Sequence, residues 1–129
     1  MHIVFKSNTG NITIQGITIN TSGSSPNTDG IDLIGTNCLV TGCSISDGDD
    51  CIALGSTGAT SSSTLITNCA FGSGHGLSIG SNTSGGVSNL TVANCTCKHG
   101  TLKAASVWLK LAVFHEKRAR VCLVSSSGY

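Results

Sequence analysis

Apolar and polar residues alternate along most of this chain in short runs, and the pattern recurs at a fixed interval. Four nine-residue segments align without gaps, namely 11–19, 37–45, 63–71 and 89–97. One position of this alignment is occupied in turn by Ile17, Cys43, Cys69 and Cys95, which are equally spaced along the chain. Each segment holds a short run rich in β-branched residues, then Gly or Asn, then a second short run. The alternation predicts strands, and the Gly or Asn predicts corners between them.

A second series of apolar pairs falls within the same period. The pairs are Ile31/Leu33, Ile52/Leu54 and Leu77/Ile79. A repeat of this length indicates a solenoid. Helical repeats would need a 3.6-residue pattern and good helix formers, which this chain lacks. We therefore predict an all-β fold, a right-handed parallel β-helix of about four coils. Equivalent residues of successive coils would then lie ~4.8 Å apart.

The repeat breaks near residue 100. From Lys103 onward Gly becomes rare, Asn is absent, and four of the seven Lys and Arg residues lie between Lys110 and Arg120. Apolar spacing between Val107 and Val113 is mildly helical. We therefore divide the chain into a partial β-helix domain, residues 1–102, and an atypical tail, residues 103–129. We expect the tail to be irregular or helical, with a solvated charged face.

Charge and cysteine content limit the partners that the chain can have. Charged residues make up 10% of the chain and the formal net charge is +1, which favours neither nucleic acid nor an anionic membrane. No apolar run approaches transmembrane length. The seven cysteines include no C-x-x-C pair, so they predict no metal site. We expect Cys43, Cys69 and Cys95 to be small buried hydrophobic residues of a monomer.

Three polar motifs precede the apolar pairs of the second series. They are Asn27-Thr-Asp-Gly30, Asp47-Gly-Asp-Asp-Cys51 and Gly72-Ser-Gly-His-Gly76. Aligned on the apolar pairs, they place Asp29, Asp50 and His75 in one column with Asp49 beside it. A β-helix would bring this column together although its members are far apart in the sequence. The fold thus predicts three carboxylates and an imidazole within about 5–10 Å.

Strict alternation creates a conflict at these motifs. It would place Asp29 on the same side of the strand as Ile31, in the core. A buried unpaired carboxylate is very costly. We therefore predict that the chain bends before each strand, at the glycines of the motifs, Gly30, Gly48, Gly74 and Gly76.

Clustered carboxylates suit acid–base chemistry. Their mutual repulsion raises the pKa of at least one carboxyl, which stays protonated as an acid while another stays ionised as a base. Glycosidic bond hydrolysis needs this division. An inverting enzyme separates the two carboxyls by ~6.5–9.5 Å, with a water between the base and the sugar. Carboxyls on adjacent coils are too close for this, whereas a diagonal pair fits.

The motifs resemble a known family. Asn27-Thr-Asp-Gly, Gly48-Asp-Asp-Cys and Gly74-His-Gly-Leu-Ser-Ile-Gly80, in this order, are similar to three of the four signature motifs of glycoside hydrolase family 28, the polygalacturonases and rhamnogalacturonases. The resemblance covers about Asn11 to Gly100. It implies a secreted, cell-wall-directed enzyme that hydrolyses α-1,4-linked galacturonic acid in pectin with inversion, using neither metal nor cofactor.

The resemblance also implies roles for individual residues. Asp49 resembles the general acid, and Asp29 and Asp50 resemble the carboxylates that activate water. His75 resembles the histidine that positions or tunes the acid. Asn27 lies in the same subsite and is expected to bind substrate.

The fourth family motif, Arg-x-Lys, is where this sequence departs. It binds the substrate carboxylate one coil further on. Continuing the alignment puts Lys103 at the Arg position and Ala105 at the Lys position, so only Lys103 is expected to bind substrate. The first residues, Met1 to Lys6, also lack the apolar run of a signal peptide. These features suggest a truncated or misjoined product that is weakly active or inactive.

Two other functions stay open. A β-helical pectate lyase would use acidic residues to hold Ca²⁺ and would cleave by elimination. His75 in the carboxylate column counts against it, because a hard cation prefers oxygen ligands. A non-catalytic β-helix, either a binding protein or a decayed enzyme, would keep the repeat without needing the acid cluster.

Overall fold

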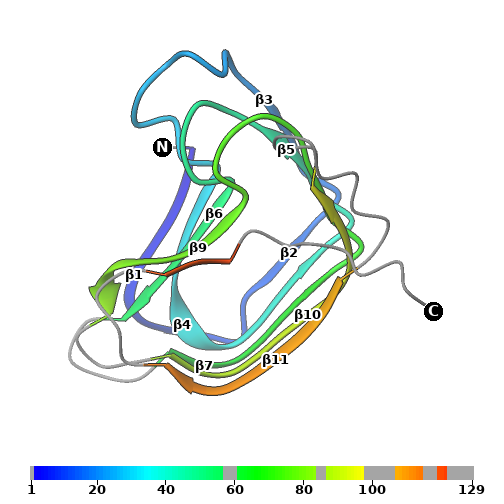
Figure 1. The fold of residues 1–129 in the computed structure, drawn as a ribbon. Helices are drawn as coiled ribbons and strands as arrows, with labels where there is room; N and C mark the ends of the chain where they lie inside the picture. Colours follow the sequence, from blue (N-terminus) through cyan, green and yellow to red (C-terminus); the bar gives the residue numbers. More distant parts are fainter. Residues whose placement is uncertain (1, 57–60, 84–86, 98–106, 115–118, 122–129) are drawn as a thin grey trace.

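The computed structural model describes residues 2–56, 61–83, 87–97, 107–114 and 119–121 (Figure 1). These residues form the strands β1 (Ile3–Gly10), β2 (Thr13–Gln15), β3 (Thr18–Asn20), β4 (Ile31–Thr41), β5 (Ser44–Ser46), β6 (Ile52–Ser56), β7 (Ser61–Thr67), β8 (Ala70–Phe71), β9 (Leu77–Thr83), β10 (Val87–Cys97), β11 (Val107–Phe114) and β12 (Ala119–Val121). Among the described residues, no helix is long and apolar enough to span a membrane.

The strands stack in three parallel sets, one strand of each set per coil (Figure 1). The first set holds β1, the start of β4, β6 and β9. The second holds β2, the end of β4, β7 and β10. The third holds β3, β5, β8 and the end of β10. Four successive coils of a parallel β-helix result, which confirms the predicted architecture.

The register of the first set matches the alignment made from the sequence. Ile31 pairs with Ile52, and Ile52 pairs with Leu77. All three side chains are fully buried. Leu33 and Leu54 are paired and buried in the same way. Ile79, also expected to point inward, has its side chain outside the described part of the chain. Apolar burial therefore fixes which residues of neighbouring coils lie side by side.

Asparagine and glycine, with one serine, form the corners between the sets. Asn11, Asn37, Ser63 and Asn89 occupy equivalent positions of successive coils, with φ of 55°, 58°, 57° and 51°. This left-handed conformation is best tolerated by Gly and Asn. Gly16, Gly42, Asn68 and Asn94 turn the next corner in the same way, with φ of 65°, 64°, 54° and 53°. The predicted corners are therefore confirmed.

The corner side chains also link one coil to the next. The amide Nδ2 of Asn37 donates to Oδ1 of Asn11 at 2.6 Å. The amide Nδ2 of Asn89 donates to Oγ of Ser63 at 3.2 Å. These side-chain hydrogen bonds connect adjacent coils on the outer surface of the solenoid.

The cysteine column lies in the core as predicted. Cys43, Cys69 and Cys95 are buried, and Ile17 at the head of the column is partly buried against them. The three thiols donate to the carbonyls two residues before them, at 3.3–3.4 Å. Each acts as a small apolar residue whose weak donor is satisfied locally. The cysteines whose side chains the structure describes form no disulfide; they are Cys38, Cys43, Cys51, Cys69 and Cys95.

The expectation that the tail is irregular or helical is wrong for residues 107–114 and 119–121. The first of these segments is β11, which pairs antiparallel with β10, and the second, β12, pairs antiparallel with β9. The last coil of a solenoid has an edge whose backbone N–H and C=O groups lack hydrogen-bond partners. A strand added at that edge supplies these partners, whereas a helix cannot. The proposed boundary between residues 102 and 103 lies outside the described residues.

The buried thiols should resist alkylation in the native protein. Burial raises the pKa of Cys43, and a hydrogen bond with Cys95 together with burial raises that of Cys69, so little thiolate forms. We expect both residues to react much more slowly with iodoacetamide in native than in urea-denatured protein. Mass mapping of the labelled peptides measures this. Labelling of either residue at the denatured rate would contradict the buried column.

Candidate active site

The predicted column lies where the chain enters the first set of strands. The amide of Gly30 donates to the carbonyl of Asp50 at 3.0 Å, and the amide of Ile52 donates to the carbonyl of Gly76 at 3.1 Å. The amide of His75 donates to the carbonyl of Asp49 at 2.7 Å. These bonds continue the strand register backward, so Asp29, Asp50 and His75 lie on successive coils. Backbone pairing therefore assembles the cluster.

The glycines before the strands act in two different ways. Gly74 and Gly76 have φ of 110° and 73°, so they provide the predicted bend. Gly30 and Gly48 do not have positive φ; they allow close packing. A Cβ at Gly30 would lie 2.5 Å from the Cys51 carbonyl, and one at Gly48 would meet the backbone of Ser25. The chain bends at Gly30, Gly48 and Gly74, so each of the three motifs has the expected bend, and only the last uses a positive φ.

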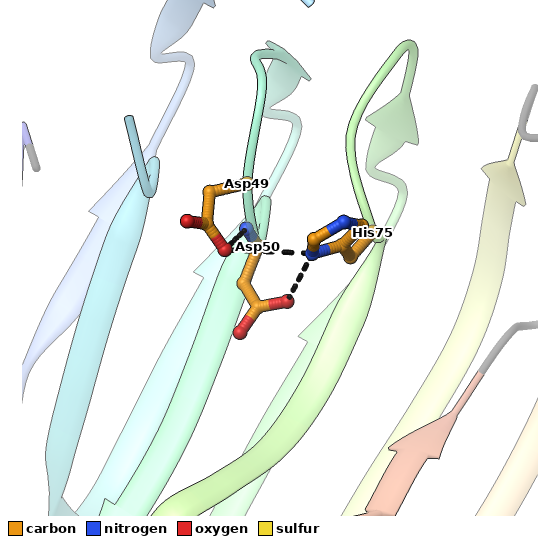
Figure 2. Close-up of side chains that lie close together, drawn as sticks. All are labelled: Asp49, Asp50 and His75. Carbon is orange, nitrogen blue, oxygen red and sulfur yellow. Dashed lines mark hydrogen bonds and ion pairs between the residues drawn. The ribbon is translucent and has the colours of Figure 1, made fainter. Parts of the chain in front are cut away.

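Asp49, Asp50 and His75 form a compact cluster (Figure 2). Nδ1 of His75 lies 3.4 Å from Oδ1 of Asp49 and 3.3 Å from Oδ1 of Asp50. Nδ1 itself is enclosed, yet it is aligned for a hydrogen bond with neither oxygen. The side chains of Asp49, Asp50 and His75 are 28%, 18% and 33% exposed. The cluster is therefore held by protein on one side and reachable from solvent on the other.

The two carboxylates of the cluster are oriented by further hydrogen bonds. The hydroxyl of Ser78 donates to Oδ1 of Asp50 at 2.6 Å. Oδ1 of Asp49 accepts from the amide of Asp50 at 3.0 Å, and its Oδ2 accepts from the amide of Asn27 at 3.1 Å. Asn27 therefore contacts the cluster through its backbone, in a left-handed conformation with φ of 54°.

Asp29 lies on the preceding coil and is partly buried. Its carbonyl accepts a bond from the amide of His2 at 3.0 Å. Its carboxyl interacts with that of Asp32 rather than with His75. Lys103, the expected substrate-binding cation, lies outside the described residues. The structure thus brings Asp49, Asp50 and His75 together, with Asp29 and Asn27 beside them.

Asp32 belongs to the site and was missed by the sequence reasoning. It follows Ile31 on β4 and pairs with Ala53, which pairs with Ser78 on the next coil. Burial and then the charge of Asp29 raise its pKa to about 6. Its Oδ1 is enclosed and lacks a hydrogen-bond donor. The alternation around Ile31 and Leu33 was the available signal, because it places Asp32 on the outer face near the column.

Asp47 lies on the buried side of the cluster and accepts a hydrogen bond from the backbone of Asp49. It is completely buried, and its Oδ1 accepts bonds from the amide of Asp49 at 3.1 Å and from the thiol of Cys51 at 3.8 Å. Its Oδ2 has no hydrogen-bond partner. Burial raises the pKa of this carboxyl. The sequence analysis placed Asp47 in the second motif without a role of its own, and no local pattern predicts that its side chain is buried.

The arrangement offers proton donors, proton acceptors and ligands for a cation. Within the part of the chain that the structure describes, Asp49, Asp50 and His75 are the group whose ligating atoms all lie within 4.8 Å of one another. The same atoms can exchange protons with a bound molecule. Geometry alone therefore allows either acid–base chemistry or metal binding.

Comparison with known proteins narrows these options. The profile of glycosyl hydrolases family 28 matches residues 1–109. The chain is 41% identical over 101 residues to a probable polygalacturonase of Arabidopsis thaliana, covering 74% of this chain and 21% of that protein. It is 43% identical over 91 residues to a polygalacturonase of Medicago sativa, covering 67% and 21%.

A third relative carries a more specific name. The chain is 39% identical over 101 residues to an exopolygalacturonase of Platanus acerifolia, covering 74% of this chain and 26% of the relative. The chain thus spans about a fifth to a quarter of the length of these curated relatives. No solved structure matches it.

Asp32 should make the unfolding free energy depend on pH. Its pKa of about 6 lies above the ordinary 3.8, so the folded state binds the proton more tightly. This stabilisation is complete below about pH 4 and is lost as the pH rises through about 6. After allowance for solvent screening, the loss is on the order of 1–2 kcal/mol. Urea denaturation across this range measures it. Asp32→Asn should flatten the profile, and an unchanged profile would contradict the assignment.

Proposed function

This chain belongs to glycosyl hydrolases family 28, and we propose that it forms part of an enzyme that hydrolyses α-1,4-linked galacturonic acid in pectin. The observation that carries the proposal is the cluster of Asp49, Asp50 and His75, with Asp29 on the neighbouring coil. The names of the polygalacturonase relatives support a pectic substrate. We further propose a secreted monomer, as expected for an enzyme whose substrate lies in the cell wall.

In the proposed reaction Asp49 is the general acid. Its carboxylate is partly exposed and its Oδ2 is positioned by the amide of Asn27, so it can reach a leaving-group oxygen. His75 lies beside it, where its imidazole can stabilise the carboxylate that forms when Asp49 gives its proton to the leaving group. Proton donation to the glycosidic oxygen breaks the bond to the anomeric carbon.

Asp29 and Asp50 are the proposed water-activating carboxylates. Ser78 donates to Asp50 and holds it in one orientation. A water that these carboxylates deprotonate would attack the anomeric carbon from the face opposite the leaving group, which inverts its configuration. Asp29 lies one coil away from Asp50. The two carboxylates can therefore accept hydrogen bonds from the same water from different sides.

The Ca²⁺-dependent lyase is the less favoured function. The family match is to hydrolases, and His75 supplies a nitrogen where Ca²⁺ prefers oxygen. We propose that the reaction needs neither metal nor cofactor. The products then distinguish the two mechanisms, because hydrolysis leaves saturated sugars whereas elimination leaves unsaturated ones.

Asp49→Asn should remove turnover with little effect on binding. The test protein is a chimera in which residues 1–97 replace the matching coils of the Medicago sativa polygalacturonase. Loss of the acid should lower kcat by about 10²–10⁴-fold, while KM changes little. Reducing-sugar release from polygalacturonate measures both, and polarimetry or NMR should show inverted products. Unsaturated products absorbing in the ultraviolet, or a Ca²⁺ requirement, would establish a lyase instead.

The 129-residue chain itself should show little or no hydrolysis of polygalacturonate. Its substrate carries a carboxylate on every sugar, which Asp29, Asp49 and Asp50 repel. Of the Arg-x-Lys pair, only Lys103 stands at a matching position. One charged hydrogen bond is worth ~1.5–3 kcal/mol, so its loss weakens binding roughly tenfold or more. A reducing-sugar assay of the purified chain measures this. Turnover equal to that of the chimera would show that the chain is sufficient.

A further inference from the structure

Asp47 lies where the three motifs meet, and the proposed reaction gives it no part. Its side chain is completely buried, and it precedes the proposed general acid, Asp49, by two positions in the sequence. We propose that Asp47 is a positioning residue for Asp49, whose backbone it holds from the buried side of the cluster. This inference rests on the proposed hydrolysis, in which Asp49 donates the proton.

The carboxyl of Asp47 contacts the backbone of Asp49 directly. The amide of Asp49 donates to Oδ1 of Asp47 at 3.1 Å. The carbonyl of Asp49 accepts a bond from the amide of His75 at 2.7 Å. Both polar groups of this peptide backbone are therefore held, one by a buried side chain and the other by the next coil. The Asp49 carboxylate is thereby kept beside the imidazole of His75 (Figure 2).

Close packing on two sides keeps the Asp47 carboxyl from turning away from Asp49. A Cβ added to Gly74 would collide with Oδ1 of Asp47, and one added to Gly30 would lie 3.3 Å from Oδ2. The two glycines, from the first and third motifs, leave the space that the carboxyl fills. The amide of Asp47 also donates to the carbonyl of Ser73 at 3.1 Å, which fixes its own backbone to the third motif.

The chemistry of the buried carboxyl suits a hydrogen-bond acceptor. Burial raises the pKa of Asp47, which shifts the balance toward the neutral acid. Oδ1 can accept the bond from the Asp49 amide in either protonation state. The thiol of Cys51 also donates to Oδ1, at 3.8 Å, whereas Oδ2 has no hydrogen-bond partner. Asparagine is therefore the closest neutral analogue, because its Oδ1 accepts in the same way.

Orientation of the acid should affect the rate more than binding. A general acid must lie within hydrogen-bond reach of the leaving-group oxygen, and a displacement of about 1 Å can cost on the order of 10²-fold in rate. Loss of the Asp47 acceptor should therefore lower kcat and leave KM nearly unchanged. The bond from the Asn27 amide to Oδ2 of Asp49, at 3.1 Å, remains, so we expect a partial loss.

Substitutions in the chimera described above separate the acceptor from the bulk of the side chain. Asp47→Ala removes the acceptor and should lower kcat on polygalacturonate at least about tenfold, with KM within about twofold. Asp47→Asn keeps the acceptor and should restore most of kcat. Ser46→Ala is the matched control, because it breaks the 2.7 Å bond between the hydroxyls of Ser46 and Ser73 without touching Asp49. Its kcat should be unchanged.

Amide hydrogen exchange of the 129-residue chain tests the same contact without hydrolysis. Measured by NMR, exchange at the Asp49 amide should be about tenfold or more faster in Asp47→Ala than in the unaltered chain or in Asp47→Asn. The amide of Ile52, which donates to the carbonyl of Gly76, should keep its rate in all three.

Three outcomes would overturn the proposal: equal kcat in Asp47→Ala and Asp47→Asn, unchanged exchange at the Asp49 amide in Asp47→Ala, or faster exchange at every amide of that variant. The last would show that Asp47 acts on the whole fold. If Asp47→Ala does not fold, Asp47→Val fills more of the space, lacks the acceptor and gives the same comparison. Absence of hydrolysis by the unaltered chimera would instead contradict the proposed function, and the exchange rate at Asp49 would still decide whether Asp47 holds it.

Discussion

Parallel hydrogen bonding between coils is the constraint on which the rest of the molecule depends. Each backbone amide in a coil must find its acceptor on a neighbouring coil, ~4.8 Å away, so the apolar residues of successive coils lie directly over one another. Ile31, Ile52 and Leu77 show this register. The same ladder extends through Gly30 and Gly76 into the motifs. A side chain placed just before a strand is therefore stacked beside its equivalent on the next coil, whatever its charge.

This stacking explains why several carboxyl groups of the site lie close enough to repel one another and why some of them are buried. Asp29 and Asp50 are brought together by backbone pairing, and Asp32 and Asp47 add two more carboxyls nearby. The pKa values of Asp32 and Asp47 rise mainly because burial disfavours their charged forms. Asp32, whose pKa is about 6, can hold a proton at mildly acidic pH, which reduces the cost of burying it. Burial thereby raises the pKa of both Asp32 and Asp47 without any motion of the backbone.

The sequence allowed the architecture and most of the cluster to be predicted, because a repeat carries its own register. Once Ile31, Ile52 and Leu77 were aligned, the positions of Asp50 and His75 followed. Asp47 could not be assigned in this way, since its burial depends on how Gly30 and Gly74 pack around it. The helix expected near Val107 was wrong because local apolar spacing says nothing about the unpaired edge of β10. Three-dimensional context decided both positions.

The corners of the solenoid have a consequence for how such a protein can diversify. The asparagine and glycine corners keep a constant interval, whereas the segments before the first set vary, with 21–30 entering β4, 47–51 entering β6 and 72–76 entering β9. Because the corner interval is constant, a shorter entry segment is offset between the first and second sets, where β4 runs on without a break but β6 and β7 are separate strands. Changes in the segments that enter the first set can therefore reshape the rim of the acidic column while the stacked interior stays in phase. The surroundings of the carboxylates can thus diversify without a change of fold.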